Sequence, residues 1–453
     1  MKVKVQDNGL RLRSNLPVEI HGLIINELED EKDALKQCAL TCRLYRHLAQ
    51  TLLFKAIVLE LLPEPESNPA QKLLAILAQS PRIVNYVRCL TFSVNFFAAA
   101  FFGKGFGMPD PDDSWVPEVL CALVNVRRLH IGLPAHETCF PELSPATMAM
   151  VHSKCQSVLH LTVEDIRDVP WTILTNLNSV ESLDLNNAHF LPDISGQPAS
   201  QTVDFHMSFP HLKRISYSTS SMNDFPGKDV TSIQSILSFL EQSTARGGLK
   251  SLSINIHNAL VPATPTHFQA VKQIISNSAE SLKTVDVTLS THVPVLLPND
   301  ELIFDDSSMP LLTELSNNEL IFNVSSMPLL TELSLTCVIS PITFHCFSRH
   351  LETVPTSGRN FNKISLHPII TNSSLVTEKK FDDECFKYFE NLVLNVVLPQ
   401  TLSLSVKFTI YGPHSTQRAE TLIKQRMPAL HAKNLLQFDT KRDAPLGLSE
   451  PSS

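Results

Sequence analysis

Two patterns of apolar and polar residues divide the chain. In the first sixty residues, apolar side chains recur every three or four positions, as in Leu16, Ile20 and Ile24. This spacing places them on one face of a helix. Pro17 fits the first turn of that helix, where its missing N–H costs nothing. The pattern therefore predicts a short amphipathic helix near the start of the chain.

Two more helices are expected directly after it. Asp33 is placed to cap the second helix, and Leu48 lies in the apolar stripe of the third. Three helices this short bury little area, and small units bury only about 60% of their unfolded surface. Extra apolar positions around Leu16, Pro17 and Ile20 must then pack against the rest of the chain or against a partner.

The remainder of the chain has a strand-like pattern, and several pieces share the frame apolar-x-x-apolar-x-apolar. The ten pieces are VRCLTFSV (87–94), VRRLHI (126–131), VLHLTV (158–163), VESLDL (180–185), LKRISY (212–217), LKSLSINI (249–256), LKTVDVTL (282–289), LTELSL (330–335), KISLHP (363–368) and LSLSVKF (402–408). Helical patterns lie between many of them, at 230–243, 267–278 and 382–394. This alternation predicts stacked strand–helix units with a parallel sheet on one face.

Three further segments stand out. NDELIFDDSSMPLLTELS (299–316) is followed at once by the nearly identical NNELIFNVSSMPLLTELS (317–334), which indicates a tandem duplication. We expect one copy in the sheet and one looped out, without a preference for either. Residues 415–439 predict a last helix and a short strand that close the exposed end of the array. Residues 440–453 predict a disordered tail.

Composition narrows the classes of function. The net charge of −8 argues against a nucleic-acid partner. Nine cysteines without a CxxC pair, and an N-terminus without an apolar signal core, predict a reducing compartment, the cytoplasm and/or the nucleus. The longest apolar run, VNFFAAAFF (94–102), is about half of the ~20 residues that a membrane-spanning helix needs. We expect it to be a buried strand followed by an insertion, and expect no membrane partner.

The N-terminal segment resembles a known family. LPVEIHGLIINEL (16–28), then DALKQCALTCR (33–43), then an alanine and LF before a short apolar strand, are similar to the F-box of fungal F-box proteins. Tyr45 departs from the family, which usually has tryptophan there. The resemblance implies a three-helix module that docks onto the Skp adaptor and, through it, a cullin. The adaptor-binding residues that it implies are Leu16, Pro17, Ile20, Leu28, Leu40 and Cys42. The alternative is an ordinary helical hairpin that caps the next domain.

The strand–helix alternation resembles leucine-rich repeats, although its units are mostly longer and less regular than the usual 20–29 residues. The predicted fold class is thus α+β overall: a small three-helix F-box followed by an irregular α/β leucine-rich-repeat-like solenoid. A twisted open α/β sheet is the alternative. The predicted domains are an F-box (11–60), a linker with a first helix (61–80) and the solenoid (81–439).

Catalytic and metal signatures are missing from the sequence. It contains no HExxH, GxSxG, CxxC pair or P-loop, and the glycine cluster GKGFG (103–107) has the wrong spacing for phosphate. We therefore expect no enzyme, metal or cofactor. The residues between the apolar positions of each strand point out of the sheet and form a candidate surface. Its members are Arg128, His130, His160, Asp184, Arg214, Asn255 and Asp286.

The functional hypothesis follows from the two resemblances. The chain is expected to be a substrate-receptor subunit of a Skp–cullin–F-box ubiquitin ligase, with an unknown protein substrate held by the repeat surface. An interaction protein that uses both parts outside any ligase is the alternative. An enzyme with an unrecognised site is the third hypothesis, which a pocket of clustered titratable residues would favour.

Overall fold

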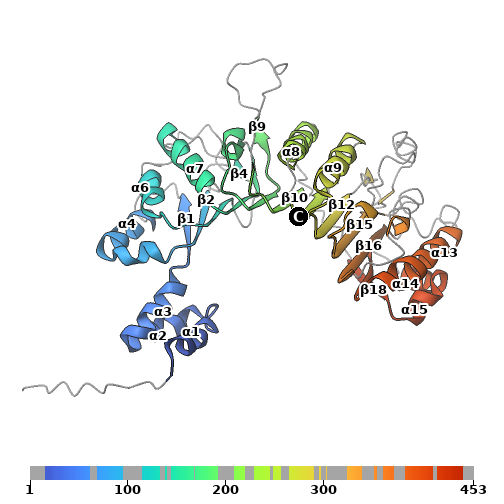
Figure 1. The fold of residues 1–453 in the computed structure, drawn as a ribbon, viewed down its shortest axis with the longest axis horizontal. Coiled ribbons are helices and arrows are strands. Elements are labelled where there is room, and N and C mark those ends of the chain that lie inside the picture. The colour runs from blue at the N-terminus through green and yellow to red at the C-terminus, as the bar shows by residue number, and fades with distance from the viewer. Residues whose placement is uncertain are drawn as a thin grey trace, which may run out of the picture.

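The computed structural model of the chain describes residues 16–61, 69–94, 115–132, 138–139, 144–167, 169–191, 209–219, 229–244, 248–256, 265–289, 295–296, 302–303, 324–338, 351–354, 361–371, 383–411 and 416–441. The described elements form an arch (Figure 1), with strands along its inner side and helices along its outer side. Three N-terminal helices lie together below one end of the arch.

One parallel sheet organises the described part of the chain. Its twelve strands follow each other in sequence order, and each pairs with the next in the parallel sense. The strands are β1 (Ala56–Leu61), β2 (Cys89–Val94), β3 (Arg128–Gly132), β5 (His160–Glu164), β8 (Ser182–Asn186), β10 (Arg214–Thr219), β11 (Ser251–Ile256), β12 (Thr284–Leu289), β15 (Glu332–Val338), β16 (Lys363–Thr371), β17 (Leu404–Tyr411) and β18 (Leu436–Lys441). All ten strand-like pieces of the sequence contribute a strand to it.

The apolar frame explains why one face of this sheet is covered. In β3, Leu129 and Ile131 are buried, while Arg128 and His130 alternate with them. The pleat of a strand sends successive side chains to opposite faces, so each apolar set packs on the helix side. Leu161 of β5 and Leu183 of β8 are fully buried at the matching positions. The opposite face is left to the polar residues.

Helices cover the outer face of the sheet (Figure 1). They are α4 (Pro69–Gln79), α6 (Trp115–Ala122), α7 (Pro145–Ser157), α8 (Asp229–Thr244), α9 (Pro265–Ser278), α13 (Asp383–Leu392), α14 (Thr416–Arg426) and α15 (Pro428–Ala432). The three helical patterns expected between strands are confirmed as α8, α9 and α13. The expected last helix and strand also form, as α14 with α15 and as β18.

Short elements join these units. Five helical turns that are not α-helical are η2 (Pro81–Asn85), η3 (Trp171–Leu174), η5 (Val324–Ser326), the π-helical η6 (Val393–Val397) and η7 (Leu398–Gln400). Three two-stranded ladders pair β4 (Thr138–Cys139) with β6 (Ile166–Arg167), β7 (Val169–Pro170) with β9 (Phe190–Leu191), and β13 (Val295–Leu296) with β14 (Leu302–Ile303).

The N-terminal helices are α1 (Val18–Asn26), α2 (Lys32–Thr41) and α3 (Arg43–Leu53). Only Ile25, Leu35 and Ala49 are buried in the hydrophobic cluster between them, and that cluster is separate from the core under the sheet. The expected cap at Asp33 is wrong: α2 begins at Lys32, so Asp33 lies inside its first turn, and the cap position, Glu31, makes no side-chain hydrogen bond to the helix.

Two polar contacts join these helices to the sheet. Nδ1 of His47 in α3 lies 2.9 Å from the hydroxyl of Tyr86, which follows η2. Lys55, directly before β1, donates to Glu29 at 2.6 Å. The helices therefore lead without a break into the first strand of the sheet.

The predicted fold class is wrong. The structure does not show α+β architecture with a small three-helix F-box and a leucine-rich-repeat-like solenoid; it shows a twelve-stranded, all-parallel sheet with helices, which is an α/β fold. The strand–helix alternation suggested leucine-rich-repeat-like units, but its strands pair side by side in one continuous parallel sheet. The alternative of an open α/β sheet agrees with the structure in its class.

The structure shows where the second copy of the tandem duplication contributes to the sheet. The second copy, 317–334, contributes the start of β15, which pairs directly with β12. Of the first copy, 299–316, the structure describes the two residues of β14. The glycine cluster 103–107, the run 95–102 and the tail after residue 441 lie outside the described residues.

The contact between α13 and α15 yields a stability prediction. Oε1 of the buried Glu390 accepts hydrogen bonds from the backbone N–H of Ala429 at 2.7 Å and of Leu430 at 2.9 Å, in the first turn of α15. Glu390→Ala leaves these donors without an acceptor and should lower the free energy of unfolding by about 1–3 kcal/mol. Chemical denaturation measures the change. Glu390→Gln keeps the accepting oxygen and should cost less; an equal loss in both variants would contradict this account.

Candidate functional site

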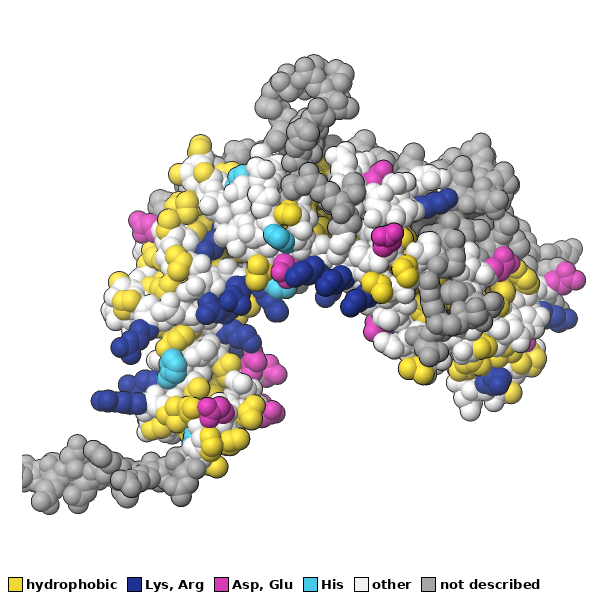
Figure 2. All heavy atoms as spheres, in the orientation of Figure 1, with side chains coloured by type: hydrophobic (Ala, Val, Ile, Leu, Met, Phe, Trp, Pro, Cys, Tyr) yellow, Lys and Arg dark blue, Asp and Glu magenta, His cyan; other side chains and the backbone are white. Residues whose placement is uncertain are grey.

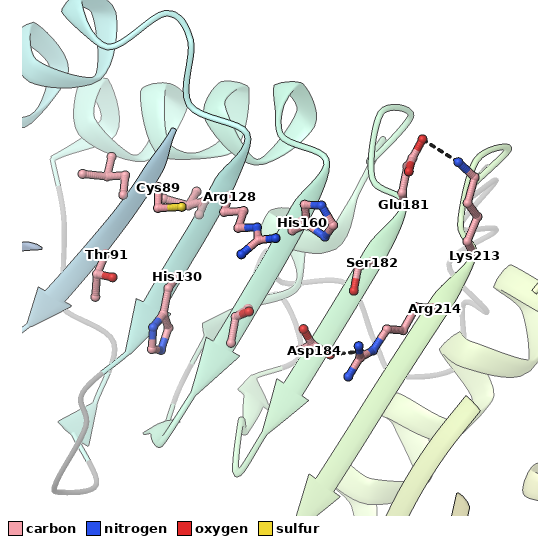
Figure 3. Close-up of a pocket in the computed structure, with 13 residues that line it drawn as sticks. Cys89, Thr91, Arg128, His130, His160, Glu181, Ser182, Asp184, Lys213 and Arg214 are labelled. Carbon is pink, nitrogen blue, oxygen red and sulfur yellow. Dashed lines mark ion pairs between the residues drawn. The ribbon is translucent and has the colours of Figure 1, made fainter. Parts of the chain in front are cut away.

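The open face of the sheet has a hollow of about 490 Å³ between β2 and β10 (Figure 3). Thirteen residues line it: Cys89, Leu90, Thr91, Arg128, Leu129, His130, His160, Thr162, Glu181, Ser182, Asp184, Lys213 and Arg214. The strand register orders them in rows. Arg128, His160, Ser182 and Arg214 form one row across four strands, and His130, Thr162 and Asp184 form the next.

Charged pairs cross the hollow from strand to strand. Lys213 pairs with Glu181 at 2.7 Å, and Arg214 Nε lies 4.0 Å from Asp184 Oδ1, which is an ion pair too long for a hydrogen bond. His130 Nε2 lies 3.1 Å from Glu164 Oε2. The hollow therefore holds both signs of charge, with the cations of Arg128, Lys213 and Arg214 exceeding its carboxylates.

Partial burial shifts the pKa of two residues in the hollow. Desolvation lowers the pKa of His160 below 6.5, and the neighbouring Arg128 cation lowers it further. Desolvation raises the pKa of Asp184 above 3.8, against the opposing effects of Arg214 and His160. Both shifts favour the neutral form of the side chain, because charge is costly to remove from water. An incoming anion would oppose the shift of the His160 pKa, because a negative charge favours the protonated imidazole.

The predicted surface residues separate into two groups. Arg128, His130, His160, Asp184 and Arg214 meet in the hollow. The other two do not line it: Asn255 lies on β11, and Asp286 lies on β12, where Oγ of Ser253 is 3.5 Å from its Oδ2. The prediction thus identifies the face of the sheet but extends past the hollow.

A further set of residues was missed from the sequence. Six cations directly precede strands, and we call them the basic rim: Lys55, Arg88, Arg127, Lys213, Lys250 and Lys283. The signal is readable in retrospect, because the pieces begin VR or LK: VRC, VRR, LKR, LKS and LKT. Figure 2 shows Lys and Arg side chains gathered along the inner side of the arch.

A second surface lies on the N-terminal helices. In α1, Ile20, Leu23 and Ile24 are 39%, 60% and 47% exposed. Their i, i+3, i+4 spacing puts them on one face of the helix, opposite the buried Ile25. Leu40 of α2 is 74% exposed. Exposed large apolar side chains grouped on one helix face mark an interaction surface more often than single ones do.

The expected adaptor residues fall mostly on this exposed surface. Leu16, Pro17, Ile20, Leu40 and Cys42 are exposed. Leu28 is different: it is half-buried and packs on the internal cluster of the three helices. Cys42 also has a local role, since its Sγ accepts a hydrogen bond from the backbone N–H of Tyr45, at the start of α3.

The hydroxyl of Tyr45 has a polar partner within the N-terminal helices. The Tyr45 hydroxyl lies 3.1 Å from Nδ1 of His21, and the two rings meet edge to face with centroids 5.4 Å apart. His21 is buried in α1. The polar group that tyrosine brings therefore has a partner within the helices.

The described residues contain no group of three or more His, Cys, Asp or Glu side chains that could hold a metal ion. No helix among them has both the length and the apolar character needed to cross a membrane. Comparison of the chain with models of protein families gives no match, and no curated protein matches it.

The lowered pKa of His160 yields a pH prediction. Between that pKa and about 6.5, the unfolded chain binds a proton that the folded chain does not, so stability falls as the pH decreases through this window. His160→Gln removes this proton. The difference in unfolding free energy, wild type minus variant, should therefore be larger at about pH 7.5 than at about pH 5.5. Denaturation at both values measures it, and a constant or opposite difference would contradict the assignment.

Proposed function

We propose that this chain is the target-binding subunit of a Skp–cullin ubiquitin ligase. Its N-terminal helices bind the Skp adaptor, and the open face of its sheet binds a target protein. The chain itself breaks no bond; ubiquitin transfer belongs to other subunits, in the cytoplasm or the nucleus. The observation that carries the proposal is the exposed apolar face of α1 in a segment whose sequence resembles an F-box.

Burial in the N-terminal helices supports a partner there. Three buried residues make up the centre of their cluster, whereas Ile20, Leu23 and Ile24 are between 39% and 60% exposed. Covering an apolar side chain of this size contributes about 1.5–3 kcal/mol when it is fully removed from water. A partner that covers this face would gain the share of that free energy that belongs to the exposed area, and Ile20 is one of the residues that the F-box resemblance assigns to adaptor contact.

The arrangement of the two surfaces supports a tethering role. The exposed face belongs to α1 and α2, and the hollow lies on β2 to β10. The contacts of His47 with Tyr86 and of Lys55 with Glu29 hold the helices against the start of the sheet. A partner on each surface would be kept at a high effective concentration relative to the other. Such proximity is what a ligase subunit must supply.

The adaptor prediction uses a triple variant, Leu16→Ala/Pro17→Ala/Ile20→Ala. Each truncation removes apolar area from the proposed interface, so affinity for purified Skp adaptor should fall by at least about tenfold. Titration calorimetry with the full chain measures the loss, and co-purification with cullin measures assembly.

The matched control is Val124→Ala/Leu329→Ala/Leu402→Ala. These three side chains are 70%, 50% and 79% exposed, and they lie outside the N-terminal helices. The control should bind the adaptor like the wild type. If the wild-type chain does not bind the adaptor, or if both variants lose binding equally, the proposed function is wrong, and an interaction role outside the ligase takes its place.

A further inference from the structure

The basic rim runs along the N-terminal ends of the strands and is interrupted between Arg127 and Lys213 by Leu159 and Glu181. Of the ten residues that directly precede the strands from β1 to β16, six are cationic and one is acidic: Lys55, Arg88, Arg127, Leu159, Glu181, Lys213, Lys250, Lys283, Thr331 and Asn362. Backbone hydrogen bonds hold neighbours together. The N–H of Lys250 donates to the carbonyl of Lys213, and that of Lys283 to the carbonyl of Lys250, each at 2.8 Å.

These bonds place like charges close together. Neighbouring strands lie about 4.8 Å apart, so Lys213, Lys250 and Lys283 follow one another at that spacing. Like charges directly opposite each other on adjacent strands are destabilising. Arg127, Arg128, Lys250 and Lys283 form no ion pair with any residue that the structure describes. Two rim cations are neutralised internally, Lys55 by Glu29 and Lys213 by Glu181, but these four are not, in a chain whose net charge is −8.

The basic rim and the first row of strand residues form a strip of positive charge, and carboxylates lie along one side of it. Asp184 and Asp286 lie two residues beyond the first row of their strands, and Glu164 lies four residues beyond. At about 3.3 Å per residue, the strip between rim and carboxylates is roughly one extended chain wide. A nucleic acid carries phosphates across a broader surface and would meet these carboxylates. A single polypeptide segment fits the strip.

We infer that the rim and the adjoining hollow bind an anionic segment of a partner protein, whose carboxylate or phosphoryl side chains lie against Lys250, Lys283, Arg128 and Arg214. The inference names the chemical class of the target and rests on the proposed function. Charge complementarity selects the segment, and apolar contact contributes little, because the row residues of the hollow are polar.

Glu181 regulates the strength of this site within the rim. It is the one acidic residue among the ten that precede strands β1 to β16, and it pairs with Lys213 of the rim at 2.7 Å. While that pair exists, Lys213 is engaged and the local charge is cancelled. Glu181→Gln would release Lys213 toward a bound anion. A gain of affinity in this variant cannot come from unfolding, so it is a more stringent test than a variant that loses affinity.

The experiment measures binding of short fluorescent peptides to the full chain by anisotropy. The peptides are rich in glutamate, in phosphoserine, or in glutamine as the neutral reference. The first or the second should bind, and affinity should fall as salt is raised. Comparison of the glutamate and phosphoserine peptides identifies the anionic group. Lys250→Glu/Lys283→Glu should weaken binding about tenfold or more, and Glu181→Gln should strengthen it several-fold.

Lys387→Glu/Lys433→Glu is the matched control. It makes the same change in net charge at exposed lysines on α13 and after α15, away from the rim, and should bind like the wild type. Equal weakening by both double variants, binding no tighter than that of the glutamine peptide, or tighter binding of single-stranded nucleic acid of equal charge overturns the inference. Skp adaptor affinity is measured on the same preparations. Adaptor binding without peptide binding refutes the inference alone, and the converse refutes the adaptor role alone.

Discussion

The backbone register of the parallel sheet is the constraint on which every surface feature depends. The carbonyl of Lys55 accepts from the N–H groups of Arg88 and Cys89, and the same bonds recur along the edge of the sheet. A slip of one residue would exchange the two faces of a strand, because side chains alternate with a period of two. Leu129 would then face water and Arg128 the core. Burial of the apolar residues of each strand therefore fixes the charged residues on the opposite face of the sheet.

The two parts of the chain differ in how well they bury their apolar residues. Under the sheet, Leu161, Leu183 and Ile215 are completely buried, and the core runs on from strand to strand. In the N-terminal helices, the fully buried set is small and includes an alanine. Small units gain little stability from so small a core. Stability of those helices must come from the join to β1 and from whatever covers α1.

Much of the local structure was predictable, because the apolar frame carries it. All ten strand-like pieces form strands. Side chains alternate between the two faces of a strand, and only the set that contains residues such as Leu129 and Leu252 is apolar enough to be buried. The fold class was not predictable from the same frame. Spacing between pieces varies, and only the pairing of β1 with β2 shows that the sheet begins directly after the N-terminal helices.

The candidate site was predictable residue by residue but not as a surface. Arg128 and Arg214 could be assigned to the open face from the pleat, yet their place in one row needs the register across β3, β5, β8 and β10. The rim was missed for a related reason. Lys250 or Lys283 alone resembles an ordinary solvated lysine before a strand, and the pattern exists only when the strands are stacked.

Competition between internal and external anions decides what this surface can do. Asp184 lies 4.0 Å from Arg214 without a hydrogen bond, and burial already favours its neutral form. It is therefore a weak competitor for the guanidinium. Glu181 is a stronger one, because its hydrogen bond to Lys213 holds the pKa of its carboxyl below the usual value. An external anion that reaches the rim would gain most over Lys250 and Lys283, which form no ion pair with any described residue, and would extend from there toward the hollow.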